Sequence, residues 1–208
     1  MRPVMREGRT EPRVELFHYA SLGFYGVGAM SGLDGEVTID DGAVWVSRVE
    51  GDDIATTGPQ AEPDAFATLL TVGCGRDWQQ ITLVDASDGP AIEDAIATLA
   101  ADHGMPVEGP LLVTIEGCAA EVGVHVVAGA CPHATPDADA WRLTLEGGAP
   151  IRIVGVFAAG RAGELTHHGT RIHLHAIFDH EGRPATAHID SMTLEPGALL
   201  RIATPTSR

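Results

Sequence analysis

The sequence predicts an α/β protein of the α+β kind, built mostly of strands. One segment, residues 87–104, has clear helical periodicity, and the second half of the chain carries a series of short runs in which apolar and polar residues alternate. With 208 residues, 44% of them hydrophobic, the chain can bury a core without help from disulfides or a structural metal. We therefore expect one compact domain or two small ones, and any metal site is expected to be functional.

The N-terminal region is predicted to form an arm followed by a hairpin. Residues 1–15 are polar, contain prolines and lack periodicity, which predicts a flexible arm, with structure starting near Leu16. A glycine-rich approach leads into two alternating runs, Glu36–Ile39 and Ala43–Val49, joined by an Asp-Asp-Gly turn typical of a β-hairpin. Residues 50–63 are predicted to be loop from their composition.

Further along, Asp64–Val72 is an apolar run that fits a short helix or a strand. The clearest helix begins at the capping residues Ser87 and Asp88, has Pro90 in its first turn and ends at Gly104. Its apolar stripe consists of Ile92, Ala95, Ile96 and Leu99. The strands predicted after it are Leu111–Glu116, Glu121–Val127, Trp141–Glu146, Ile151–Phe157, Arg171–Phe178, Ala185–Leu194 and Ala198–Ile202, with a proline and aspartate cluster at Pro132–Asp139.

Charge and cysteine content exclude several classes of partner. The formal net charge of −16 would repel nucleic acid and anionic membranes, and no apolar run is long enough to span a bilayer. The three cysteines, Cys74, Cys118 and Cys131, are odd in number and lack CxxC spacing, which favours buried thiols in a reducing compartment. We expect a cytoplasmic protein.

Three of the ten histidines are predicted to converge on one face of a sheet. The run RIHLHAIF places His173 and His175 on the same strand face, together with Arg171, by the period of two. The turn DHEGRP brings back a second strand, on which His188 can lie opposite the pair. Three neutral imidazoles with open positions are typical of catalytic zinc, although another divalent transition metal is possible.

Other assignments of these histidines remain open. An HxH pair also arises by chance in a chain rich in histidine, with the rings solvated or buried in the core. Neighbouring His167, His168 and His180 have loop-like contexts, and His168 or His180 could replace His188 as third ligand.

Several segments together resemble the α-acetolactate decarboxylases. In order, they are YGVGAMSGLDGEVTIDDGAVWV, DAFATLLTV, LLVTIEG, IVGVF, and RIHLHAIF followed by AHIDSM, and the resemblance extends from Tyr19 to Ile202. It implies an N-terminal mixed β-sheet with packed helices at 16–106, often extended across a homodimer, and a small antiparallel β-barrel carrying the metal site at 107–208. It also implies zinc held by His173, His175 and His188, with Glu36 of the LDGE segment as an active-site acid/base.

Two departures from the family pattern concern the substrate carboxylate. Where the family has an arginine, in the strand after the LLVTIEG segment, this chain has His125, and Arg171 is a candidate replacement for that anchor. The chain also ends at LLRIATPTSR, without the tail that carries a second glutamate in the family. A more distant resemblance, to the plant-and-prokaryote conserved domain, includes an HxH and a third histidine but lacks the YGVGAMSGLDGE region.

The resemblance implies decarboxylation of 2-acetolactate, or a close 2-hydroxy-3-oxo acid, to acetoin and CO2. A zinc-stabilised enediolate would take up the electron pair left by CO2, and Glu36 would return the proton. Two alternatives remain. One is a related metal-dependent enzyme that enolises another β-keto or hydroxy-keto substrate, and the other is a metal-stabilised domain without catalysis.

Overall fold

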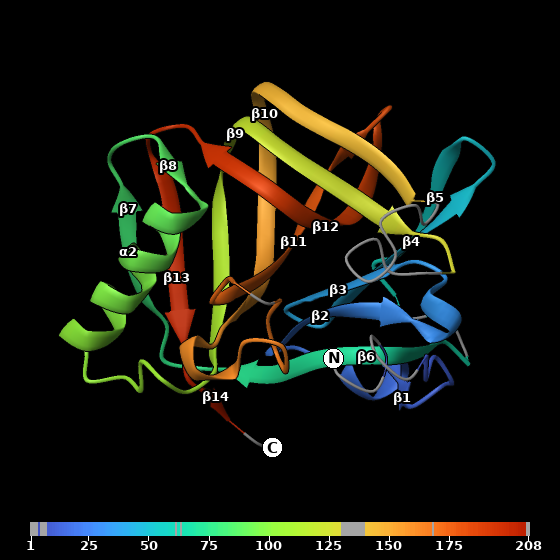
Figure 1. Cartoon of the computed structure of the whole chain (residues 1–208), viewed down its shortest axis with the longest axis horizontal. Helices are drawn as coiled ribbons and strands as arrows, with labels where there is room; N and C mark the ends of the chain where they lie inside the picture. Colours follow the sequence, from blue (N-terminus) through green and yellow to red (C-terminus); the bar gives the residue numbers. More distant parts are fainter. Residues whose placement is uncertain are drawn as a thin grey trace.

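The structure is a computed structural model that describes residues 8–60, 64–129, 140–167 and 169–206, together with Val4 and Glu62. Two antiparallel sheets lie on opposite sides of the molecule in Figure 1, and the helix α2 (Gly89–Asp102) lies against the second sheet. Strands β3 and β4 of the first sheet contact β12 of the second. The described chain is mostly strand, which is consistent with the predicted α+β class.

The first sheet has the strand order β1-β6-β2-β3-β4-β5, with β14 also paired to β6. Its strands are β1 (Val14–Glu15), β2 (Phe24–Met30), β3 (Glu36–Asp40), β4 (Ala43–Glu50), β5 (Asp53–Thr57), β6 (Phe66–Gly75) and β14 (Pro205–Thr206). The predicted hairpin is confirmed as β3 and β4. The predicted mixed sheet with packed helices is wrong, because every pairing here is antiparallel and α2 contacts strands of the other sheet. The short turns between β2, β3, β4 and β5 permit only antiparallel neighbours.

Four strands of this sheet, β1, β2, β5 and β6, lie in segments that the sequence did not clearly predict as strands. The glycine-rich approach forms β2, in which Gly28 lies so close to β6 that a Cβ would collide with the Leu69 carbonyl. The segment predicted as loop contains β5, which pairs with β4 through a two-residue turn at 51–52. The ambiguous apolar run from Asp64 is strand β6. Within the predicted arm, β1 pairs with β6, so this part of the arm is held by the sheet.

The second sheet has the order β7-β13-β9-β10-β11-β12-β8, and β12 also pairs with β9. Its strands are β7 (Gln79–Leu83), β8 (Ser87–Asp88), β9 (Leu111–Val127), β10 (Ala140–Phe157), β11 (Ile172–His180), β12 (Arg183–Leu194) and β13 (Ala198–Ala203). The pairings among β9, β10, β11 and β12 therefore form a closed ring. Strands β7 and β8 precede the boundary predicted near residue 106, yet they pair with strands of this sheet.

Two long strands replace four predicted short ones. Leu111–Glu116 and Glu121–Val127 are parts of the single strand β9, and the two runs expected before and after residues 147–150 are parts of β10. The register shifts between Glu146 and Ala149, where Gly147 and Gly148 both have positive φ. A bulge of this kind bends a strand without ending it, whereas glycines in a sequence are typical of a turn.

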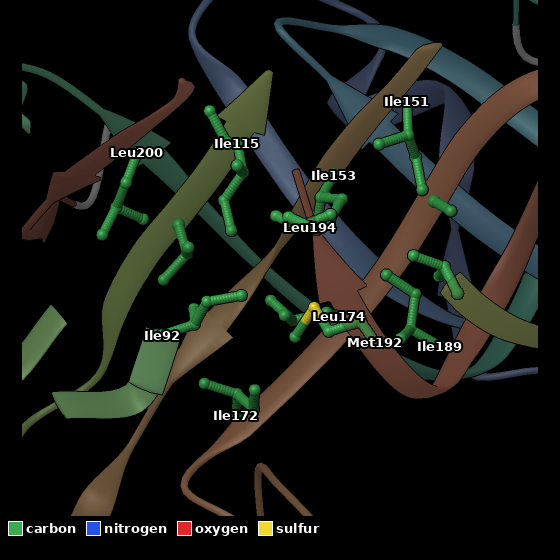
Figure 2. Close-up of a cluster of buried hydrophobic side chains, with 14 of the residues drawn as sticks. Ile92, Ile115, Ile151, Ile153, Ile172, Leu174, Ile189, Met192, Leu194 and Leu200 are labelled. Atoms are coloured by element: carbon green, nitrogen blue, oxygen red, sulfur yellow. The ribbon is translucent and has the colours of Figure 1, made fainter. Parts of the chain in front are cut away.

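Helix α2 begins as its sequence predicts and closes the core of the second sheet. The Oδ1 atom of Asp88 accepts a hydrogen bond from the Ala91 amide at 3.0 Å, which caps the first turn. Ile92, Ile96 and Leu99 are buried, and Figure 2 shows Ile92 among aliphatic side chains of the strands. Each such side chain stabilises the fold by about 1.5–3 kcal/mol when fully buried.

Some sequence features remain outside this description. Cys74 and Cys118 are free thiols, whereas Cys131 and the cluster Pro132–Asp139 lie outside the described residues. None of the helices in the described ranges has the length and apolar character needed to cross a membrane.

Candidate metal centre

Three histidines form a row across adjacent strands of the second sheet. His175 on β11 is paired with His188 on β12, and His188 is paired in turn with His125 on β9. Directly opposed residues of antiparallel strands have their side chains on the same face. The ring centroids are accordingly 5.4 Å apart for His175 and His188 and 4.8 Å apart for His125 and His188. The sequence prediction that β12 brings His188 opposite the HxH pair is confirmed by this register.

Two further histidines extend the row into a cluster. The ring centroid of His173 lies 5.2 Å from that of His175 and 5.1 Å from that of His188. His167, in the loop before β11, places a ligand atom within 4.8 Å of ligand atoms of both His173 and His188. His180 does not take part, because its Nε2 lies 2.8 Å from Asp53 Oδ1 at the edge of the first sheet. His168 lies outside the described residues.

Burial favours the neutral form of two imidazoles of the cluster, those of His175 and His188. Burial lowers the pKa of His175 and that of His188 well below the usual range, and repulsion from the neighbouring histidines lowers them further. A neutral imidazole has a lone pair on one ring nitrogen and is the form that binds a metal ion.

A chain of hydroxyl groups assigns the tautomer of His175. The Thr186 hydroxyl donates to the Ala176 carbonyl at 3.0 Å, so it can only accept from Thr38 Oγ1, 2.5 Å away. Thr38, having donated its proton, can only accept from Nδ1 of His175 at 3.2 Å. The carbonyl of Val37 also accepts a hydrogen bond from this ring, which again requires a proton on the ring nitrogen that donates. That nitrogen is Nδ1, because Nε2 has no hydrogen-bond partner among the described residues. Nδ1 therefore carries the proton, and Nε2 carries the lone pair.

The lone pair of His175 has no hydrogen-bond donor among the described residues. Its Nε2 is fully buried and has no hydrogen-bond partner among the described residues. Such an atom costs about 1–3 kcal/mol unless a ligand satisfies it. The residues therefore fit a metal ion, and a donor set of imidazoles without thiolates suits zinc or a similar divalent transition metal.

Glu36 enters the cluster from the first sheet. It follows Gly35, whose φ of 118° is open to glycine and where a Cβ would collide with the Ser47 carbonyl. Its Oε2 lies 3.6 Å from His175 Nε2, and its Oε1 lies 4.0 Å from His125 Nε2. Burial raises the pKa of Glu36 well above its usual range, a backbone hydrogen bond from Val127 offsets part of the rise, and the charge of Asp190 adds to it. Burial therefore favours the neutral form of both Glu36 and His175 over an ion pair.

His125 also belongs to the cluster, with one ring nitrogen fixed by Asp190. Its Nδ1 donates to Asp190 Oδ1 at 2.9 Å, and Asp190 Oδ2 accepts from Arg142 at 3.1 Å. The register between β12 and β9 shifts between Ile189 and Ser191, so Asp190 lies at a bulge. His125 is thus buried beside Glu36, where it faces the site with Nε2.

Arg171 does not reach the site, contrary to the sequence prediction. Its Nε lies 2.8 Å from Glu93 Oε2 and its Nη2 2.6 Å from Asp94 Oδ1, both on α2. Strand β11 begins at Ile172, so the alternation that would have placed Arg171 on the face of His173 does not extend to residue 171. Two carboxylates hold this guanidinium, and it is not available as an anchor for a substrate.

A pocket of about 480 Å³ leads from the start of α2 to the histidines. Its histidine lining consists of His167, His173 and His188. Apolar side chains such as Leu174 and Met192 form part of the wall, and Asp88, Glu93 and Asp190 contribute carboxylates. Among the described residues, no lysine or arginine lines it. A small, polar molecule of a few carbon atoms would fit beside the cluster.

The sequence did not identify every residue that forms this centre. The sequence indicated only a loop context for His167. The alternation of residues along a strand does not predict where a loop side chain lies. The roles of Thr38 and Thr186 depend on contact between the two sheets, at sequence separations of 137 and 148 residues. The pairing of Asp190 with His125 depends on the bulge between Ile189 and Ser191.

Solved structures share this fold over nearly the whole chain. Acetolactate decarboxylase from Bacillus subtilis subspecies spizizenii superposes with a TM-score of 0.70 at 19% identity, covering 97% of this chain and 82% of that one. The α-acetolactate decarboxylase of Bacillus subtilis strain 168 gives 0.69 at 19% identity, with 98% and 86% covered.

A Staphylococcus aureus protein of unknown function, described as similar to α-acetolactate decarboxylase, gives a TM-score of 0.64 at 13% identity, with 95% and 80% covered. No protein-family model and no curated relative matches the sequence. The resemblance to acetolactate decarboxylases is therefore confirmed at the level of the fold.

Proposed function

We propose that this protein is a metal-dependent decarboxylase that converts 2-acetolactate, or a close 2-hydroxy-3-oxo acid, to acetoin and CO2. One observation carries the proposal: a buried glutamate, whose pKa is raised by burial, lies 3.6 Å from the lone-pair nitrogen of His175 in a cluster of histidines, in a fold shared with acetolactate decarboxylases. A domain that only bound a metal for stability would not need a buried acid beside the ligands, and burying one costs stability.

His173, His175 and His188 would hold the metal. When bound, the ion would act as a Lewis acid that stabilises negative charge developing on substrate oxygens. His175 is prepared for this role by the hydroxyl groups of Thr38 and Thr186, which leave its Nε2 unprotonated toward the cluster.

Glu36 would hold and deliver the proton. Loss of CO2 leaves an electron pair that is delocalised into the adjacent ketone as an enediolate, and the carbon must then be protonated. The carboxyl of Glu36, buried next to His175, is a suitable donor because burial raises its pKa and so favours the form that carries a proton. His125, whose Nδ1 donates to Asp190, lies near the other oxygen of this carboxyl and could accept a hydrogen bond from a substrate hydroxyl through Nε2.

A second candidate function is favoured by the pocket lining. Among the described residues, the pocket has no guanidinium or ammonium group that could clamp a carboxylate, and Arg171 is held by Glu93 and Asp94. The same acid and the same ligands could enolise an uncharged hydroxy-ketone, a reaction in which no carboxylate needs to be bound. A homodimer, which the family resemblance implied, stays a prediction that sedimentation analysis can test.

The experiment combines metal analysis with a product assay. Protein purified without chelator is expected to contain about one zinc or similar ion per chain and to form acetoin from racemic acetolactate. The His173→Ala/His175→Ala variant should lose both, whereas a His18→Ala/His103→Ala control, altered at two exposed histidines, should keep both. No acetoin from the metal-loaded wild type would refute decarboxylation of this substrate and favour the enolising alternative. Equal, near-zero metal in wild type and variant would remove the site.

A further inference from the structure

We infer that His167 is a fourth imidazole ligand of the metal centre, carried by the loop between β10 and β11. The inference rests on the proposed function, because it assumes that His173, His175 and His188 hold a metal ion. It goes further in assigning a ligand outside the sheet. The centre would then have three ligands fixed by strand register and one supplied by a loop.

The position of His167 is the first observation. Its ligand atom lies within 4.8 Å of those of His173 and His188, which is the spacing of side chains that close on an ion with small rotations. Its ring centroid is 5.4 Å from that of His173 and 4.9 Å from that of His188. Both ring pairs are edge-on, at 72° and 84°. His167 therefore approaches the same space as the strand histidines from a different direction.

The loop that carries His167 is the second observation, because hydrogen bonds on both sides of the residue hold it in place. Before it, Gly163 N donates to the carbonyl of the fully buried Thr166 at 2.8 Å. After it, Thr170 Oγ1 donates to Glu93 Oε1 of α2 at 2.7 Å, and Thr166 Oγ1 donates to the Thr170 carbonyl at 2.8 Å. A ligand on such a loop loses little freedom when it binds, which favours coordination.

The consequence for the site is a change in its coordination. Three imidazoles leave a fourth position of a tetrahedral ion open, and a fourth imidazole fills it. His167 also lines the pocket, together with His173 and His188, so it would contact a molecule bound there. The ion would be held more tightly than by the strand histidines alone, and His167 would be the ligand contributed from outside the sheet.

A spectroscopic test reads the ligand directly, without activity. Cobalt(II) bound to His167→Cys should show the near-ultraviolet thiolate-to-cobalt charge-transfer band that its coordination by sulfur produces. The matched control is His180→Cys, which places a thiol at a histidine outside the cluster, with wild-type protein as the baseline for the native cysteines. A band in His167→Cys alone supports the inference. Its absence there, or its presence in both variants, overturns it.

Metal affinity provides the second measurement. His167→Ala should weaken Zn²⁺ binding by at least about tenfold in chelator competition, since even residues behind the ligands contribute 10–100-fold. Unchanged affinity would overturn the inference. Unchanged Zn²⁺ affinity in His175→Ala would also overturn the inference, because His167 would then be the third ligand in place of His175. Wild-type protein that takes up neither ion would refute the proposed function itself, whereas uptake with no effect at residue 167 would refute this assignment alone.

Discussion

Replacing Thr186 by valine is expected to weaken Zn²⁺ binding although Thr186 does not touch the metal position. Valine has nearly the shape of threonine but no hydroxyl, so the Thr38 hydroxyl loses the group to which it donates. Thr38 can then turn its proton toward Nδ1 of His175, which favours the tautomer with the proton on Nε2. A protonated Nε2 has no lone pair for a metal ion.

The size of the effect follows from the contacts around the ring. Loss of a partner behind a metal-binding histidine commonly costs 10–100-fold in affinity. Here the Val37 carbonyl also accepts from the ring and still favours a proton on Nδ1. We therefore expect the lower end of that range, about tenfold, which corresponds to about 1.4 kcal/mol.

The assay is chelator competition for Zn²⁺ at constant pH, with urea unfolding of the metal-free protein measured in parallel to separate folding from binding. Thr186→Ser keeps a hydroxyl and should bind like wild type. Thr38→Val should match Thr186→Val, and the double variant should lose little more, because both act through one hydrogen-bonded chain. Wild-type affinity in Thr186→Val, with a loss in Thr38→Val alone, would show that the hydroxyl chain does not set the tautomer.

Three further predictions concern the other groups of the site. Glu36→Gln should keep its metal while turnover falls by roughly 10² or more, because a general acid commonly contributes 10²–10⁴; an unchanged rate would make Glu36 structural. Arg171→Ala should lower the free energy of unfolding by about 1 kcal/mol through loss of its pairs with Glu93 and Asp94, yet leave KM for acetolactate nearly unchanged. A KM raised tenfold or more would restore Arg171 as the carboxylate anchor. In metal-free Glu36→Gln, stability should fall as the pH drops below about 6.5, by up to about 1.4 kcal/mol per pH unit for each of His175 and His188. The histidines of the unfolded chain take up protons in this range, while burial keeps the pKa values of His175 and His188 lower in the folded state. The free energy of unfolding in urea should therefore be lower at about pH 5.5 than at about pH 7.5. Equal free energies at the two pH values would contradict the burial argument.

Features that depend on neighbours in the sequence could be predicted, and features that depend on distant pairing could not. Helix α2, the β3–β4 hairpin and the facing of His188 toward the HxH pair follow from capping residues, turn chemistry and the period of two. In each case the residues that determine the structure lie within about one turn or hairpin of one another.

The metal centre was predicted in part for the same reason. The hairpin β11–β12 carries three of its histidines, whereas His125 joins through the pairing of β9 with β12 and His167 through the fold of a loop. Arg171 was misplaced because alternation was extended one residue beyond the start of β11, where Glu93 of α2 takes its side chain. Electrostatic pairing with a helix that is distant in the chain cannot be read from a strand pattern.

The closed ring of β9, β10, β11 and β12 has a consequence for the order in which the protein folds. Within the ring, His125 and Asp190 are 65 residues apart in the chain, and the contact between Thr38 of the first sheet and His175 of the ring spans 137 residues. Contacts of such long range form slowly, because the entropy of closing the intervening loops is lost before they become favourable. The complete binding centre is therefore expected to form only when the ring closes against the first sheet, although its three hairpin histidines lie close together in the chain. The rate at which the refolding chain binds metal would therefore report the last step of folding. A metal ion added earlier would meet the hairpin histidines before Thr38 and His125 have reached them.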